Sequence, residues 1–379
     1  MTTRRPLPTA DGWALAGAIA LGPTPSHAGP RAELETVAGF DLHPTAQERR
    51  FNEFTLDRAE LGVREMNPIP LDYELRLESV RAAGRESITG VDGDSLVLRV
   101  KRAWGGLVQR FGTGDSRISV AARLGLVADA WVETALGQYP LRDLSPLAAE
   151  RDGFFDATDL GVAFEGRAWG DRVTVRLAWT NGEGRNEIEQ NRGKDTTVAV
   201  QVEAWRFDFL DAPASLVLAA GYRDGSAGLS GARDHRVTGA VTASGARLAV
   251  GAEYVRAMGL SGDADREADA LGLWAQGLLI APYWGLAVRY DHRRPVLADS
   301  TARQDAVRGA TFLDLSSLIS PDAVERCRLY LGAEHDDASR SGAPLAGVPS
   351  ATPTDRLFLT LALQAASGPT APLQDTPEK

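Results

Sequence analysis

One serine in this sequence stands in a motif that hydrolytic chemistry could use. Ser95 lies in the tetrapeptide Gly-Asp-Ser-Leu, where a serine can act as a nucleophile if an Asp-x-x-His pair supplies the base and its orienting carboxylate. The downstream histidines lack that aspartate: His235 follows Ala232, His292 follows Arg289 and His335 follows Gly332 at the required spacing. The tetrapeptide reads better as a turn that enters the strand LVLRV. We therefore expect a protein that is not an enzyme.

Two acidic segments and one thiol are the remaining candidates for chemistry. The segment EHDD (334–337) contains a histidine beside three acids, but no paired-ligand spacing such as HExxH occurs, and a solvated strand end explains it better. The segment NGEGRNEIEQNRGKD (181–195) lacks the ligand spacing of an EF-hand and indicates a mobile outer loop. Cys327 is the single cysteine, which excludes an intramolecular disulfide and a cysteine metal cluster. We expect no metal and no cofactor.

The strongest pattern in the sequence is an alternation of charged and apolar residues. In DYELRLESVRA (72–82), Glu74, Arg76 and Glu78 alternate with Tyr73, Leu75 and Leu77. A period of two places the apolar residues on one face of a strand and the charges on the other, whereas a helix would scatter them. The same alternation recurs in segments 172–179, 197–205, 247–254, 285–293, 327–335 and 356–364.

The alternating segments predict about sixteen strands, with 14 or 18 as the alternatives. Short turns such as GRAWGD (166–171) and TASGA (242–246) alternate with longer polar connections. Strands of about ten residues with alternating short and long connections are typical of an outer-membrane barrel. The strands are expected near residues 32, 53, 71, 94, 116, 158, 171, 195, 214, 233, 246, 267, 284, 303, 324 and 355.

The apolar face distinguishes a membrane barrel from a soluble β-sandwich. It consists of Leu, Val, Ala, Phe and Trp with few charges, and several strands end in aromatic residues, including Trp179, Trp205 and Tyr254. Such a face suits lipid, and the terminal aromatics suit the membrane interface. The fold class is therefore all-β, a transmembrane antiparallel up-and-down barrel. The formal net charge of −10 argues against a nucleic-acid partner.

The N-terminus predicts export. Arg4 and Arg5 precede the apolar run WALAGAIALG (13–22), and Ser26 and Ala28 occupy the small-residue positions of a signal-peptidase site. Residues 1–28 are expected to be a cleaved signal peptide, residues 29–367 the barrel, and residues 368–379 a polar tail. The expected location is the outer membrane, with its lipid as a partner. A soluble periplasmic β protein is the weaker alternative.

Several blocks also resemble a known family. FTLDRAELGVR (54–64), RLGLVADAWVE (123–133), ERDGFFDATDLGVAFEGR (150–167) and RLAWTNGEG (176–184) look like successive segments of the phosphate-selective porin O and porin P family. The resemblance implies a sixteen-stranded barrel, often a homotrimer, that passes small solutes. That family's lysine-lined approach to its pore cannot be mapped, because the only lysines are Lys101, Lys194 and Lys379.

The charged face of each strand is expected to line the pore. On the charged faces of the strands, basic residues outnumber acidic ones, and rings of arginine attract anions. The acids on these faces are Glu60, Glu74, Glu78, Glu165, Glu203, Glu253, Asp291 and Glu334. We expect a channel for small hydrophilic solutes, anions among them, with Arg172 and Arg176 contributing most to anion preference. The alternative is a barrel with a closed lumen, a structural or binding role and no conductance. The predicted pore-lining residues are Arg58, Arg64, Arg76, Arg99, Lys101, Arg123, Arg172, Arg176, Arg247 and Arg289.

Overall fold

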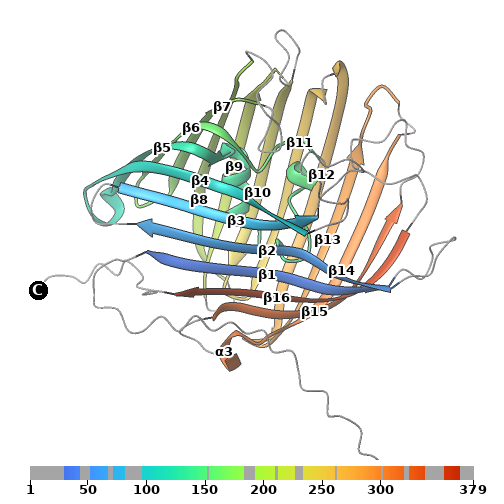
Figure 1. Cartoon of the computed structure of the whole chain (residues 1–379). Coiled ribbons are helices and arrows are strands. Elements are labelled where there is room, and N and C mark those ends of the chain that lie inside the picture. The colour runs from blue at the N-terminus through green and yellow to red at the C-terminus, as the bar shows by residue number, and fades with distance from the viewer. Residues whose placement is uncertain are drawn as a thin grey trace, which may run out of the picture.

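The computed structural model is a closed barrel of sixteen antiparallel strands (Figure 1). Each strand pairs with its neighbours in sequence, and β1 closes the ring on β16. The structure describes residues 30–42, 52–66, 71–81, 96–151, 153–182, 193–209, 212–226, 234–260, 263–299, 302–319, 324–337 and 354–367. The predicted fold class, strand number and strand positions are confirmed. The strands are β1 (Arg31–Leu42), β2 (Asn52–Met66), β3 (Leu71–Arg81), β4 (Leu96–Phe111), β5 (Ile118–Ala128), β6 (Thr158–Ala168), β7 (Val173–Thr180), β8 (Asp195–Phe209), β9 (Ala212–Asp224), β10 (His235–Gly245), β11 (Leu248–Leu260), β12 (Asp263–Ile280), β13 (Trp284–Arg294), β14 (Gln304–Asp314), β15 (Val324–Asp337) and β16 (Thr354–Ser367).

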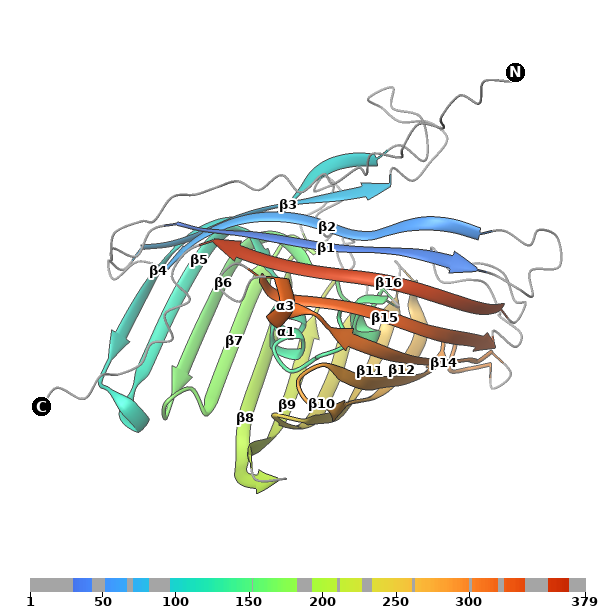
Figure 2. The same ribbon diagram turned by 90° about the horizontal axis from the view of Figure 1, so that it is seen from below.

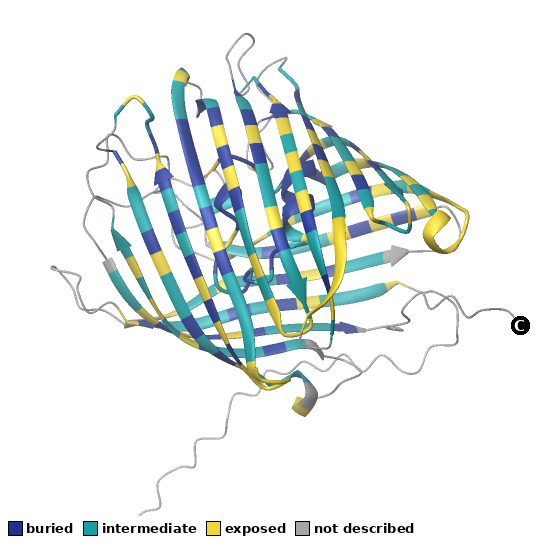
Figure 3. Ribbon diagram, turned by 180° about the vertical axis from the view of Figure 1, so that it is seen from behind, coloured by how far each residue is buried: buried dark blue, intermediate teal, exposed yellow. Residues whose placement is uncertain are grey.

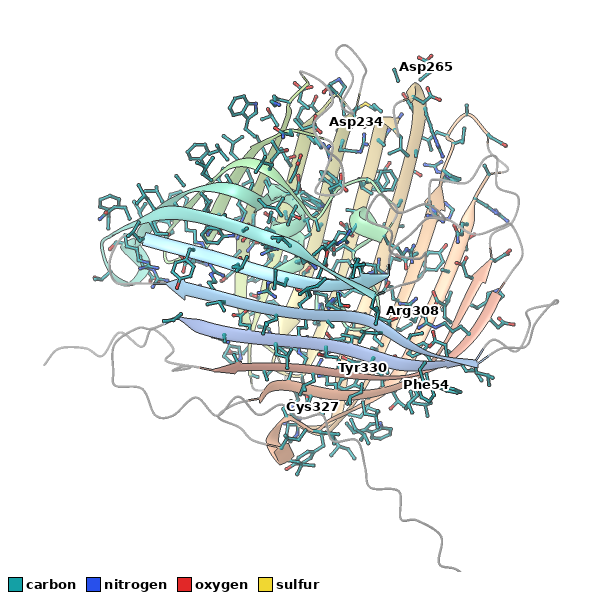
Figure 4. The ribbon with its side chains drawn as sticks, viewed as in Figure 1. Phe54, Asp234, Asp265, Arg308, Cys327 and Tyr330 are labelled. Carbon is teal, nitrogen blue, oxygen red and sulfur yellow. The ribbon has the colours of Figure 1, made fainter. Side chains whose placement is uncertain are left out.

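The two faces of each strand differ as the alternation predicts. On β3, Tyr73 and Leu75 are exposed on the outside, while Glu74 and Glu78 are buried on the inside. The banding continues around the barrel (Figure 3), and Phe54, whose side chain is labelled in Figure 4, is 82 % exposed. An outer belt of exposed Leu, Val, Phe, Tyr and Trp therefore surrounds an inner wall that carries the charges.

The connections at the two ends of the barrel differ in length. At one end, here called the turn end, most connections are short, such as 112–117, 169–172, 246–247 and 281–283. At the other, the loop end, most are longer, including 43–51, 82–95, 129–157 and 338–353, with 261–262 as a short exception. No helix of the described residues is long and apolar enough to cross a membrane.

One long connection lies inside the barrel. Residues 129–157, here called the inward segment, join β5 to β6 and contain α1 (Ala130–Leu136) and α2 (Ala148–Arg151). The helical turns of this segment lie within the ring of strands (Figure 2). The other helical elements are the 3₁₀ turn Gly114–Ser116 and α3 (Ser316–Ile319), both at the turn end.

The buried core of the protein is formed by the inward segment and the wall that it covers. Trp131, Leu141, Leu147 and Phe154 of the segment belong to one buried apolar cluster. The wall residues of that cluster come mainly from β7, β8 and β11–β16, and many are small: Ala178, Ala199, Ala257, Ala268, Ala270, Ala287, Ala310 and Ala362. Small inward side chains leave the volume that the segment fills.

Candidate functional site

The inward segment begins where β5 ends, at a helix cap. The Asp129 carboxylate accepts hydrogen bonds from the backbone amides of Trp131 and Val132, at 2.8 and 3.1 Å, and so starts α1. Its second oxygen accepts from the Thr197 hydroxyl of β8 at 2.8 Å. Burial raises the pKa of Asp129 above its ordinary value, although the Arg223 guanidinium lowers it. The cap thus turns the chain into the lumen and fastens it to the wall.

Trp131 is the anchor of the segment. Its side chain is 0 % exposed, and it packs against Gly221 of β9, where an added Cβ would lie 2.8 Å from the Trp131 ring. The indole nitrogen donates a hydrogen bond to Glu253 of β11 at 3.1 Å, and the second oxygen of Glu253 accepts from the backbone amide of Ala148 at 3.0 Å. A single carboxylate, 1 % exposed, therefore holds both helices of the segment.

A second attachment lies on β13. The Arg289 guanidinium binds Asp291 on its own strand at 2.7 Å and contacts the Tyr139 hydroxyl of the segment. Asp291 also accepts from Arg151 of α2 at 2.7 Å. The Tyr139 ring packs edge-on against Trp274, and burial raises the pKa of Tyr139 to about 12.

The middle of the segment reaches the opposite side of the barrel. The backbone carbonyl of Arg142 accepts from Arg58 of β2 at 3.0 Å, and its guanidinium lies 3.3 Å from Glu60. Asp143 pairs with Arg326 of β15 at 3.3 Å, and Arg308 of β14 donates to the Leu144 carbonyl. Figure 4 labels Arg308 of β14 and Tyr330 of β15, two neighbouring strands of this part of the wall. The segment is therefore held at many points of the wall and crosses the lumen.

These attachments divide the lumen into two unequal environments. The inner faces of β7–β16 are largely covered by the segment and by their own buried apolar side chains. Charged side chains also line the inner faces of β8–β13, where most are buried, such as Arg223 and Arg289. On the inner faces of β2–β6 several remain partly exposed, including Arg64 and Arg99 at 33 % of their side chains. Polar space in the barrel therefore remains along β2–β6.

The charges on β1–β4 form a network of ion pairs. Arg76 contacts Glu33 at 2.6 Å, Glu74 at 2.9 Å and Glu60 at 3.2 Å. Lys101 donates to Glu60 at 2.6 Å, and Arg99 to Glu78 at 2.7 Å. Because each of these basic side chains contacts at least one carboxylate, ion pairs link the strands and this part of the wall is close to neutral.

The structure places most of the predicted pore-lining residues on the inner wall, but it corrects the roles of four. Arg176 is on the inner face, yet it pairs with Glu165 of β6 at 2.8 Å, so its charge is compensated. Arg289 is 2 % exposed and lies beneath the inward segment instead of lining open space. Arg172 and Arg247 are exposed in the β6–β7 and β10–β11 turns instead of on strands. The structural basis for expecting Arg172 and Arg176 to dominate anion preference is therefore not met, because Arg172 lies in a turn and Arg176 is paired with Glu165. The others, on the inner faces of β2–β5, are Arg58, Arg64, Arg76, Arg99, Lys101 and Arg123.

The candidates for other chemistry have simple structural positions. Ser95 and most of the segment 181–195 lie outside the described residues. His292 and His335 pair with Asp305 and Asp355 on neighbouring strands at 2.8 and 2.7 Å, and the EHDD segment ends β15. Cys327 is a buried free thiol. Within the described ranges, no group of three or more His, Cys, Asp or Glu side chains could hold a metal ion.

Sequence reasoning missed the inward segment, with Trp131, Tyr139 and Arg142 among its key residues. The available signal was an aspartate before the apolar, helix-compatible stretch AWVETAL, in a connection too long for a turn and too apolar for an exposed loop. Glu253 gave no such signal, because the sequence alone does not distinguish it from the other acids on the charged faces of the strands.

Comparison with solved structures gives the same architecture. The barrel superimposes on the anion-selective porin from Comamonas acidovorans with a TM-score of 0.53 and 13 % identity, covering 89 % of this chain and 99 % of that one. OmpF from Salmonella typhi, solved in complex with daunomycin, gives 0.58 and 11 % identity over 88 % and 97 % of the two chains. OprB from Pseudomonas putida gives 0.56 and 10 % identity over 89 % and 94 %. The chain has the fold of a porin. No family model and no curated protein sequence matches it.

Proposed function

We propose that this protein forms an aqueous channel in an outer membrane, narrowed by the inward segment and passing small hydrophilic solutes. The observation that carries the proposal is the division of the lumen: the segment packs onto β7–β16, while the wall of β2–β6 keeps its charged side chains. Partly exposed charged side chains require water beside them, and an open path through the lumen supplies it. The outer apolar belt and the likeness in fold to porins support the membrane setting.

Planar-bilayer recordings test the channel. The refolded protein should give stepwise conductance increments in KCl, and its mobility on a gel should depend on heating, as expected of a stable barrel. A folded, heat-modifiable protein that produces no increments would contradict the channel and favour the closed-lumen alternative with a structural or binding role.

We further propose a weak preference for anions. The network on β1–β4 is close to neutral, so the preference must come from arginines whose charge the wall does not compensate. Reversal potentials across a KCl gradient should therefore show excess chloride permeability. Changing Arg176 to Ser should shift the potential little, because Glu165 keeps its contacts with Arg167 at 2.8 Å and Arg123 at 3.7 Å and stays compensated. Cation selectivity of the native channel would refute this part. Phosphate specificity, which the resemblance to the porin O and porin P family implies, stays a prediction.

Export and assembly complete the proposal. The signal peptide 1–28 and the tail 368–379 lie outside the described residues. N-terminal sequencing of protein purified from outer membranes should begin at Gly29, and an intact Met1 would contradict the predicted cleavage. The resemblance to the porin O and porin P family implies a homotrimer, so chemical cross-linking in detergent should give a trimer, and a monomer alone would contradict this assembly.

A further inference from the structure

A cluster of arginines lines a recess in the inner wall near the turn end of the barrel. The recess has a volume of about 140 Å³ and lies between β2 and β6, and Glu133 of the inward segment approaches its lining at Arg123. Five guanidinium groups line it, and we call it the arginine recess: Arg64, Arg110, Arg117, Arg123 and Arg167.

The acids around this recess compensate only part of its positive charge. The three that line it are Asp72, Glu165 and Asp171. Asp171 forms an ion pair with Arg117, and Glu165 forms ion pairs with Arg167 and Arg176, each at 2.8 Å. Asp72 lies 3.8 Å from Arg64, at the outer limit of an ion pair. The lining thus has more guanidinium groups than carboxylates.

Arg110 carries the uncompensated charge most clearly. It is exposed at the turn end of β4, and it makes no ion pair with any residue that the structure describes. A guanidinium has five N–H donors in a rigid, planar arrangement that matches a carboxylate or phosphate. The side chain is therefore available to a solute in the recess.

An aromatic platform holds two of the other arginines. The guanidinium carbons of Arg123 and Arg64 lie 4.8 and 5.9 Å from the centre of the Trp104 ring. Trp104 is fixed in turn by a hydrogen bond from its indole nitrogen to Glu74 at 3.2 Å. Stacking on an aromatic face restrains a guanidinium while leaving its in-plane donors available.

The donors of the stacked arginines are incompletely used. The Nε atoms of both Arg64 and Arg123 are buried without a hydrogen-bond partner, and the carboxylates nearest to Arg123 are 3.6 and 3.7 Å from it, at Glu133 and Glu165. Buried polar donors normally have partners, so these positions call for an acceptor.

We propose that the arginine recess is a binding site for a small solute that carries oxyanion groups, carboxylate or phosphate, on its way through the barrel. Arg110 binds the solute from the open side, while Arg64 and Arg123, held on Trp104, bind it from the wall. This site gives the proposed channel a class of solute, and it rests on the channel function only for the route by which the solute arrives. Binding itself requires only the folded barrel.

Block of the KCl current by added succinate or inorganic phosphate tests the proposal. Either anion should reduce the conductance in a saturable way, and the Arg110→Gln variant should raise its half-blocking concentration by roughly tenfold or more, because a charge-assisted contact is lost. Block by succinate alone identifies a carboxylate solute, and block by phosphate alone identifies a phosphate. The matched control is Arg206→Gln, which removes one positive charge at the same end of the barrel but outside the recess, and its half-blocking concentration should stay unchanged.

Calorimetric titration of both anions into the detergent-solubilised protein separates the two proposals. A protein that conducts KCl but is neither blocked nor bound by either anion keeps the channel and overturns the binding site. Equal effects of the two variants also overturn it, since the block would then reflect overall charge. A protein that does not conduct but binds succinate or phosphate, with weaker binding in Arg110→Gln, refutes the channel and supports the site.

Discussion

Replacing Trp131 by alanine should release the inward segment without unfolding the barrel. The side chain is fully buried between Gly221 and Glu253, so its removal leaves a large cavity, which costs about 3 to 5 kcal/mol. The loss of the indole N–H also leaves one oxygen of Glu253 without a partner, at about 1 to 3 kcal/mol. The two costs are not additive. Even the lower bound raises the undocked population of the segment by roughly two orders of magnitude.

The pairing of the strands does not involve the Trp131 side chain, so the lost free energy weakens the packing of the inward segment on the wall and not the barrel itself. Single-channel recordings of Trp131→Ala should show larger or noisier conductance steps than the wild type, while heat-modifiable gel mobility stays normal. Trp131→Phe isolates the hydrogen bond, because it keeps most of the aromatic volume, and should give an intermediate effect.

Trp179→Ala is the matched control. This tryptophan is 54 % exposed on the outer face of β7, where its loss cannot widen the lumen. If Trp131→Ala and Trp179→Ala give the same conductance as the wild type, the inward segment does not limit the channel, and the reasoning from its packing is refuted.

Two further predictions test the faces of the wall and the titration of the segment. Leu124→Arg, on the outer face of β5 at a side chain 67 % exposed, should destabilise the membrane-inserted barrel by about 2 to 4 kcal/mol if it lies near the bilayer midplane. Ala121→Glu, three residues away on the inner face beside the guanidinium groups of the arginine recess, should fold normally. Equal urea midpoints of the two variants in lipid vesicles would mean that the outer belt does not contact lipid. Burial raises the pKa of Tyr139 to about 12 in the folded state, whereas the pKa of an unfolded tyrosine is about 10. Between these pH values the folded state binds one more proton than the unfolded state. The contribution of Tyr139 to the free energy of unfolding is therefore intact below about pH 10 and falls as the pH rises from about 10 to about 12. Urea unfolding at pH 9 and pH 12 should show a loss that is about 2 to 3 kcal/mol larger in the wild type than in Tyr139→Phe, and an equal loss in both proteins would contradict the assignment.

Much of the fold could be predicted from the sequence because strand patterning is local. Successive side chains of a strand point to opposite faces, so in β3 the polarity of a residue alone assigns it to the outer or the inner face. Tyr73 and Leu75 are thereby placed outside and Glu74 and Arg76 inside, without knowledge of the rest of the barrel. Lipid outside and charge inside therefore leave the same signature in every strand. The order of strands follows from short, antiparallel connections, which leave little choice of neighbour.

The pairing of charges depends on register, which the sequence did not supply. Arg176 reads as an unopposed lumen charge along its own strand, where no acid adjoins it. In the barrel it lies directly opposite Glu165 of β6, because the tight β6–β7 turn sets that register. The same inter-strand alignment leaves Arg110 without an acid and makes it, instead of Arg172 or Arg176, the candidate anion contact.

Strand positions and most lumen-facing side chains follow from local alternation, whereas the packing of the closed barrel sets where the lumen remains polar. The inward segment is apolar enough to be buried, but nothing local says against which wall. Its partners Glu253 and Arg289 stand more than a hundred residues away, and only the closure of the ring brings them to Trp131 and Tyr139. Contacts between residues so distant in sequence form only when the whole barrel does, so the shape of the pore is a property of the closed sheet.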